Sequence, residues 1–283
     1  MKKKIIIIGI LVLIAMLAII LPKTLFKNLF NKDNQNENTT VYNVLVYVQD
    51  TNNRLVGLNV GVTELEEDVI RQKWDLLTSK SNQLPENYKS LIPANTVLNE
   101  YSIENNCLNL NVSSQIKDGI GRKTVETIAW TFINDEIESV KLLVEGVEVN
   151  TIGDYSYKQI NKQMGINLNY ETMHIFEANF TTVLYQEDNY LLPVTYFHLN
   201  DDITDFIVMK ALEQADLGLS QEVYNYTLEN NVLTIDFVDA SILSNNQIAT
   251  IAESIAFNLP VNSLNINNNE NLFYQRVFND ITE

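Results

Sequence analysis

The side chains that most often carry out chemistry in proteins are scarce in this 283-residue chain. It has two histidines, His174 and His198, and one cysteine, Cys107. The histidines lie 24 residues apart, with no cysteine or further histidine at the short spacing of zinc ligands. Cys107 opens a segment of alternating apolar residues, which is typical of a small buried hydrophobe. We therefore expect the histidines to be packing or surface residues, and we expect no metal site and no cysteine nucleophile.

Two other patterns match binding or catalytic motifs only in part. Gly119-Ile120-Gly121 precedes two basic residues but lacks the spacing of a phosphate-binding or dinucleotide-binding loop, so it predicts a turn before a helix. Acidic residues cluster at 64–68 and at 201–205, where they fit the first turns of helices. No pair of carboxylates is singled out for glycoside hydrolysis, although that chemistry stays open. The prediction is a protein that is not an enzyme, with no catalytic, cofactor-binding or metal-binding residue.

The N-terminus predicts a membrane anchor. Three lysines precede an apolar run from Ile5 to Leu21, whose 17 residues are at the short end of what spans a bilayer as a helix. The run ends without the small residues of a cleavage site, which favours a retained anchor over a cleaved signal. The positive-inside rule gives a cytoplasmic N-terminus. We expect residues 1–21 to be a single-pass anchor in the cell membrane, residues 22–40 to be a disordered linker, and the bulk of the chain to be extracytoplasmic.

The charge distribution excludes one class of partner. The first 32 residues hold six lysines and no acid, so the rest of the chain carries 13 basic and 36 acidic residues, a net charge of −23. Such a surface repels the phosphates of nucleic acids and anionic lipid headgroups. We expect contact with the membrane through the N-terminal helix, no nucleic-acid binding, and no small-molecule substrate that the sequence identifies.

An internal repeat is the most informative feature of the sequence. Residues 103–112 (IENNCLNLNV) and 228–237 (LENNVLTIDF) both predict a strand, an Asn-Asn turn and a second strand. An amphipathic helix follows in each copy, with apolar residues on one face from Val125 to Ile133 and from Ile248 to Leu259. A strand with the same alternation then closes each copy. The two closing strands are residues 137–142 and 261–266.

The front half of each copy fits a hairpin followed by a helix. The hairpin strands are residues 44–48 and 54–60 in the first copy, and residues 182–185 and 190–196 in the second. Pro193 predicts that its strand lies at a sheet edge or ends there. A capping-box pattern predicts a helix from near Thr63, and Asp201 or Asp202 caps its counterpart. Each copy is then a β-β-α-β-β-α-β module, and the fold class is α+β.

These elements set the expected boundaries. Module one is predicted at residues 41–150 and module two at residues 179–283, with residues 151–178 as a linker between them. The apolar tail from Leu272 to Ile281 predicts a short helix that docks on module two.

A known family shares several of these features. The block 90–98 (SLIPANTVL), the Asn-Asn hairpin after it and the strand 140–146 (VKLLVEG) resemble GerMN, the "sporulation and spore germination" domain of the GerM family. The resemblance covers about residues 41–270. Module two lacks the Leu-Ile-Pro block, and the chain lacks the lipid-attachment cysteine of the family's lipoproteins. The resemblance implies small modules similar to the ring-building folds of secretion and sporulation channels.

Two functions remain open. The tandem modules, the anchor and the resemblance favour a membrane-anchored, extracytoplasmic scaffold or interaction protein of GerM type. It would act by self-association or with other envelope proteins, in a cell-envelope or sporulation-related complex. The alternative is an extracytoplasmic cell-wall glycan-binding module or weak hydrolase that uses an acidic cleft between the modules.

Overall fold

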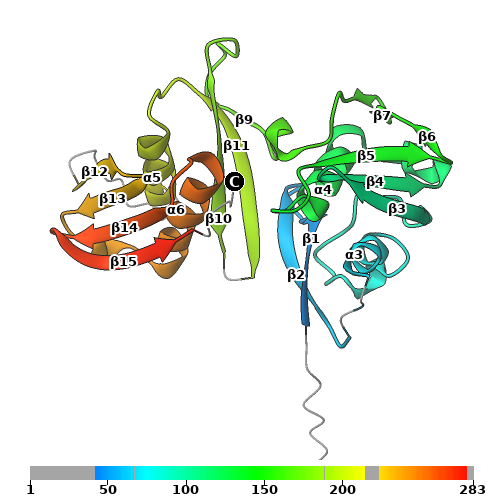
Figure 1. The fold of residues 1–283 in the computed structure, drawn as a ribbon, viewed down its shortest axis with the longest axis horizontal. Coiled ribbons are helices and arrows are strands. Elements are labelled where there is room, and N and C mark those ends of the chain that lie inside the picture. The colour runs from blue at the N-terminus through cyan, green and yellow to red at the C-terminus, as the bar shows by residue number, and fades with distance from the viewer. Residues whose placement is uncertain (1–41, 65, 67, 188, 214–222, 279–283) are drawn as a thin grey trace, which may run out of the picture. The chain divides into compact units, whose positions relative to one another are not determined.

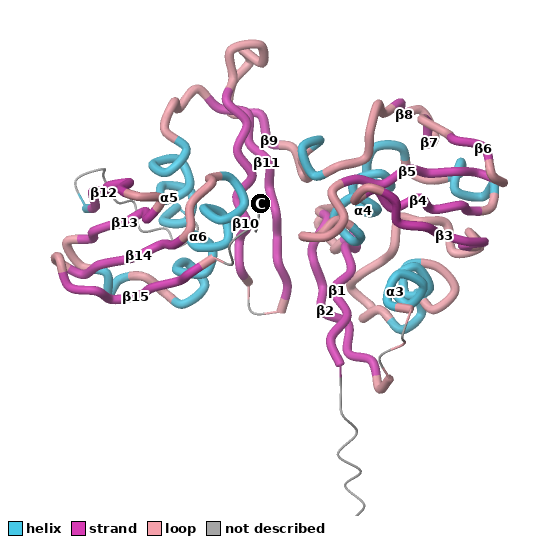
Figure 2. The backbone as a smooth tube through the Cα atoms, in the orientation of Figure 1, coloured by secondary structure: helices cyan, strands magenta, loops and turns pink. Residues whose placement is uncertain are grey.

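The computed structural model describes residues 42–278 apart from residues 65, 67, 188 and 214–222, and Figures 1 and 2 trace its chain. The predicted anchor (1–21) and linker (22–40) lie outside the described residues. Within the described part of the chain, no helix is both long and apolar enough to cross a membrane.

Module one has the predicted order of elements, followed by one further short strand, β6. Its strands and helices are β1 (Tyr42–Gln49), β2 (Leu55–Val62), α3 (Val69–Leu77), β3 (Leu98–Glu104), β4 (Cys107–Val112), α4 (Gly121–Phe132), β5 (Ser139–Val144) and β6 (Val147–Glu148), with 3-10 turns at Ser81–Gln83 and Ser114–Asp118. The sheet order is β3-β4-β5-β6, and β4 and β5 run parallel. Val125, Ile128 and Ala129 of α4 are fully buried, which confirms the predicted apolar face.

Module two repeats this order. Its strands and helices are β10 (Asn179–Gln186), β11 (Tyr190–His198), α5 (Ile203–Glu213), β12 (Tyr224–Glu229), β13 (Val232–Phe237), α6 (Asn245–Asn258), β14 (Ser263–Asn268) and β15 (Asn271–Val277), with a 3-10 turn at Ala240–Ile242. The sheet order is β12-β13-β14-β15, again with a parallel central pair. Both asparagines of each Asn-Asn turn have positive φ, as a two-residue hairpin requires. The α+β class is therefore confirmed.

The first helix of module one starts later than predicted. It begins at Val69 instead of near Thr63, and the Asp68 side chain caps it by accepting the backbone N–H of Arg71 at 2.9 Å. The prediction was wrong because β2 continues to Val62, so the chain needs the following residues to turn. In the acidic cluster at 64–68, the side chain of Asp68 caps this helix.

The predicted docking helix at the C-terminal tail is also wrong. Residues Asn271–Val277 form β15, which pairs antiparallel with β14. Asn269 and Glu270 both have positive φ and make the hairpin turn between them. Glu145 and Gly146 make the corresponding turn before β6 in module one. Residues 279–283 of the tail lie outside the described residues.

The segment between the modules contributes to the core. It contains the short strands β7 (Thr151–Ile152), β8 (Tyr155–Ser156) and β9 (Asn169–Tyr170) and a 3-10 turn at Lys162–Met164. Ile152, Ile160 and Ile166 are fully buried. The backbone N–H of Val140 in β5 donates to the carbonyl of Ile160 at 2.9 Å. Residues 151–178 are therefore packed and hydrogen-bonded along much of their length.

Candidate functional site: the junction between the two modules

One sheet runs through both modules, in the order β1-β2-β11-β10. β2 is the second strand of the module-one hairpin, and β11 is the second strand of the module-two hairpin. They pair antiparallel at two positions, Tyr190 with Leu58 and Leu191 with Gly57. The two copies of the repeat therefore meet through equivalent strands, and backbone hydrogen bonding joins them.

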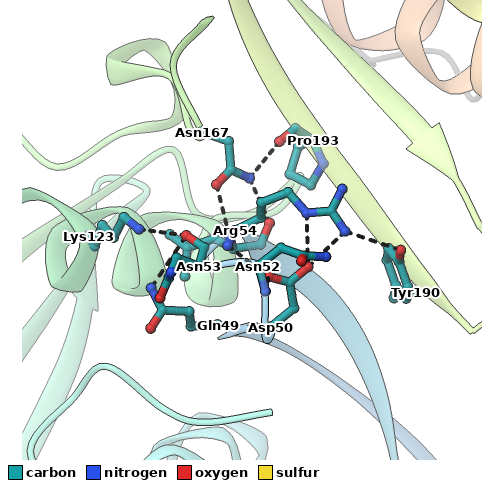
Figure 3. Close-up of polar contacts among 10 residues, drawn as sticks. Gln49, Asp50, Asn52, Asn53, Arg54, Lys123, Asn167, Tyr190 and Pro193 are labelled. Atoms are coloured by element: carbon teal, nitrogen blue, oxygen red, sulfur yellow. Dashed lines mark hydrogen bonds and ion pairs between the residues drawn. The ribbon is translucent and has the colours of Figure 1, made fainter. Parts of the chain in front are cut away.

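Direct pairing ends where a proline interrupts β11. Extending the register by three residues from Tyr190 and Leu58 sets Pro193 opposite Leu55. A proline has no backbone N–H to donate. The side chain of Asn167 fills this place: its Oδ1 accepts the N–H of Leu55 at 2.8 Å, and its Nδ2 donates to the carbonyls of Leu55 at 2.7 Å and of Pro193 at 2.8 Å. Figure 3 shows Asn167 reaching Pro193. The side-chain amide of Asn167 thus takes the place of the backbone hydrogen bonds that β2 and β11 do not form at Pro193.

Pro193 itself departs from its predicted place. It lies in the middle of β11, opposite Leu184 of β10, and β11 is an inner strand. The strand tolerates it because the proline backbone faces the Asn167 side chain, which supplies a donor and needs none from Pro193.

Helix α4 holds the loop that carries Asn167. The guanidinium of Arg122 donates to the Met164 carbonyl and pairs with Glu126 at 2.6 Å. The backbone of Asn167 has a φ of 46°, a left-handed conformation that asparagine tolerates better than most residues. Ile166 is fastened to β11 by two hydrogen bonds with Thr195, each 2.9 Å long. The loop is therefore held from module one and from module two at once.

The Glu126 carboxylate is almost completely buried. Burial raises its pKa, while the Arg122 guanidinium and the backbone N–H of Asn167 act in the opposite direction without cancelling the effect. A carboxyl whose pKa is higher in the folded than in the unfolded state stabilises the fold at low pH and loses that contribution as pH rises above its unfolded value near 4.5.

We therefore expect Glu126→Gln to gain stability relative to the unmodified protein as pH rises from 4.5 to 7.5. Glutamine keeps the shape and an acceptor oxygen but cannot ionise. The measurement is urea unfolding of both proteins at several pH values. Glu253→Gln is the control, because it removes a carboxylate that pairs with Arg276 at a more exposed site. A pH-independent difference for Glu126→Gln would contradict this account of the buried carboxylate.

The turn of the β1–β2 hairpin adds a second contact across the junction. The Asp50 carboxylate accepts the backbone N–H groups of Asn52 at 2.9 Å and Arg54 at 2.8 Å, which fixes the turn. Arg54 pairs with Asp50 at 2.8 Å and donates to the Tyr190 hydroxyl at 3.5 Å. Lys123 of α4 donates to the carbonyl of Asn53 at 2.5 Å (Figure 3). The turn is thus tied both to α4 and to β11.

The outer strands of the shared sheet are covered by the helices. In module two, three backbone N–H groups of β10 donate to side chains that recur every four residues along α6. These bonds run from Thr182 to Asn258 at 3.1 Å, from Leu184 to Ser254 at 2.8 Å, and from Gln186 to Thr250 at 2.9 Å. In module one, Tyr47 of β1 donates to Thr131 of α4 at 3.0 Å. Because strand edges with free N–H groups recruit further strands, this cover limits the sheet to the two modules.

The residues that the sequence analysis considered for chemistry lie on separate elements. His198 ends β11, where it is buried, stacks on Phe206 at 3.6 Å and lies 2.9 Å from the Thr181 hydroxyl. Burial lowers its pKa, so it is a neutral packing residue near pH 7. His174 is exposed between β9 and β10, and Cys107 is half-buried at the start of β4. The Gly119–Gly121 segment is the predicted turn before α4, with a φ of 48° at Gly121.

Sequence reasoning missed the residue on which the junction depends. Asn167 is one asparagine in a chain rich in them, and its role depends on contacts with Leu55 and Pro193, 112 and 26 residues away. The sequence feature that could have pointed to this role of Asn167 is Pro193. A proline inside an otherwise regular strand pattern indicates that some other group must supply the missing hydrogen bond.

The comparisons with known proteins agree with this architecture. Residues 29–150 match the Germane family model, described as "Sporulation and spore germination". Module one therefore lies within a segment similar to the GerMN domain of the GerM family. The tandem GerMN domains of the sporulation protein GerM from Bacillus subtilis superpose with a TM-score of 0.68 at 21% identity, covering 82% of this chain and 92% of that one. The similarity extends the tandem GerMN fold to both modules.

Two further comparisons complete the findings. The first GerMN domain of the same Bacillus subtilis protein gives a TM-score of 0.40 at 20% identity, covering 43% of this chain and 98% of that one. No curated protein sequence matches the chain significantly.

Proposed function

We propose that this protein is a non-enzymatic scaffold of GerM type, anchored in the cell membrane by residues 1–21 with its modules outside the cytoplasm. The observation that carries the proposal is the junction. Two modules joined by one sheet, with Asn167 bridging β2 and β11, present their surfaces in one fixed relation. A fixed relation between surfaces is what a scaffold needs and what a pair of tethered domains lacks.

The anchor is supported by the apolar run from Ile5 to Leu21 and by the lysines before it. Those residues lie outside the described part of the chain. The acidic surface of the remaining chain supports protein partners over nucleic acid. The proposed partners are other proteins of the cell envelope, including those of a sporulation-related complex, or further copies of this chain.

The test is sedimentation velocity of the detergent-solubilised full chain, alone and with candidate envelope proteins of its host. The scaffold predicts a stable complex, and it predicts that Asn167→Asp weakens that complex because the modules lose their fixed relation. A chain that stays monomeric and binds no envelope protein would count against the proposal.

The glycan alternative keeps one physical basis. The open face of the β3–β6 sheet is hollowed by a cavity of about 460 Å³, and Glu100, Glu104 and Glu148 are among its lining residues. This hollow lies on module one, whereas the sequence analysis placed an acidic cleft between the modules. The test is whether the full chain releases soluble fragments from purified cell wall. Release that Glu100→Gln abolishes would favour the hydrolase function over the scaffold function.

A further inference from the structure

Figure 2 traces the loop between β9 and β10, and several large apolar side chains of this loop are exposed. We call residues 171–178 the apolar loop. Met173 and Phe176 are fully exposed, at 96% and 106%, and Ile175 is half-exposed. Next to the loop, Tyr170, Phe180 and Leu199 are also exposed. Large apolar groups gathered in this way on a soluble domain indicate a contact surface, whereas single exposed apolar residues are ordinary.

The loop is held in this exposed shape. Phe197 of β11 stacks on Tyr170 at 4.8 Å and meets Phe180 edge-on at 5.3 Å, which forms an aromatic base. The backbone N–H of Glu171 donates to the Phe197 carbonyl, and that of Glu177 donates to the His174 carbonyl, both at 3.0 Å. The apolar side chains are therefore presented by a hydrogen-bonded turn on a firm base, which lowers the entropy lost when a partner binds.

A buried cation fastens the start of the loop to α5. The ammonium group of Lys210, of which only 10% of the side chain is exposed, pairs with Glu171 at 2.6 Å and with Glu213 at 2.8 Å. It also lies 5.2 Å from the ring centre of Tyr196. These contacts consume the positive charge of Lys210, so it does not neutralise the surface around the loop.

The rim of the apolar loop is acidic. Between Lys162 and Lys210 the sequence contains seven acidic residues and no lysine or arginine. Glu171, Glu177 and Asp201 are exposed. Asn179, at the start of β10, donates to the Asp201 carboxylate at 3.3 Å, which places that carboxylate beside the end of the loop. An apolar centre within an acidic rim repels anionic lipid and a second copy of this acidic chain, and it is complementary to a basic surface.

We propose that the apolar loop is the docking site for a protein partner that presents an apolar pocket rimmed by lysine or arginine. Phe176 and Met173 fill the pocket, and Glu177 and Asp201 face the basic rim. Aromatic residues that enter a desolvated pocket dominate the energetics of most interfaces. The inference rests on the interaction role proposed above, and it names the surface and the kind of partner.

The test is photo-crosslinking in the host cell with the full-length chain. The photoreactive amino acid p-benzoylphenylalanine replaces Phe176 in one strain and Phe273, an exposed residue of β15, in a control strain. We expect position 176 to form an adduct with an envelope protein, within a peptide that contains apolar residues and lysine or arginine. Adding Met173→Asp, or Glu177→Lys with Asp201→Lys, should lower its yield at least about tenfold.

Three results would overturn this inference: an adduct with lipid alone, an adduct with a second copy of the chain, or an adduct that the added substitutions leave unchanged. The scaffold and the loop can fail separately. If the sedimentation experiment finds an envelope partner but position 176 captures none, the docking site is wrong and the scaffold stands. If neither finds a partner, both proposals fail.

Discussion

Asn167→Asp is expected to uncouple the two modules. Aspartate has almost the same shape and accepts the left-handed backbone, but it cannot donate to the carbonyls of Leu55 and Pro193 and would place a charge between them. Losing two donated hydrogen bonds, and leaving carbonyls without a partner at a half-buried site, costs about 2–4 kcal/mol. Asn167 is the residue that bonds to both strands where Pro193 stops their pairing, so the cost falls on the junction.

Hydrogen exchange detected by mass spectrometry measures this effect where it arises. Peptides covering residues 55–58 and 190–193 should exchange faster in Asn167→Asp, while the β4–β5 and β13–β14 pairs should not change. Asn269→Asp is the matched control, since Asn269 also has a positive φ, of 53°, and lies in an exposed turn. Asn167→Gly separates the effect of losing the side-chain amide from the effect of the backbone conformation, because glycine adopts positive φ freely but has no side chain. Unchanged exchange at the junction in Asn167→Asp would remove Asn167 from this role.

Thr250→Val is expected to destabilise module two. Thr127→Val, the same change in module one, is expected to cause no loss of stability. The two threonines occupy the same position of the repeated helix, each two residues after its first core residue, and both are fully buried. The Thr250 hydroxyl accepts the backbone N–H of Gln186 in β10 at 2.9 Å. In module one the corresponding strand residue, Gln49, donates to the carbonyl of Lys89 instead, at 2.8 Å. Among the described residues, the Thr127 hydroxyl has no hydrogen-bond partner.

The pair is its own control because valine has the shape of threonine without the hydroxyl. Thr250→Val leaves the Gln186 N–H without an acceptor and should cost about 1–3 kcal/mol. Thr127→Val removes an unpaired buried hydroxyl and should be neutral or slightly stabilising. Urea unfolding of the two variants beside the unmodified chain gives both values. Equal costs at the two positions would show that the helix hydroxyls do not protect the edge of the shared sheet.

The sequence predicts the repeated fold well because each element is predicted independently from both copies of the repeat. The Asn-Asn hairpins and the buried faces of α4 and α6 lie where the pattern places them, since each depends on residues close in the chain. The closing strands are present but begin two residues later than predicted, at Ser139 and Ser263. At the start of α6, Ser244 and Gln247 have the spacing of a capping box, and both of its reciprocal hydrogen bonds are present. Such local chemistry reads directly from spacing.

The failures have two physical causes. The apolar tail from Leu272 predicts a helix because short apolar runs do not distinguish helix from strand. The turn at Asn269 and Glu270, both with positive φ, makes this segment the second strand of a hairpin. Asn167 and Pro193 could not be paired because their contact depends on how two modules meet. Patterns within one module carry no information about the register between β2 and β11, which is set only when the copies pack.

We infer that two copies of one module form a single unit with a fixed internal geometry. The most direct test is a distance measurement by electron–electron resonance between spin labels at Ser102 in module one and Thr227 in module two, with Cys107 replaced by serine. We expect one narrow distance distribution for the otherwise unmodified chain, and a broad one after Asn167→Asp. A broad distribution before that substitution would show that the modules move independently, which contradicts the account.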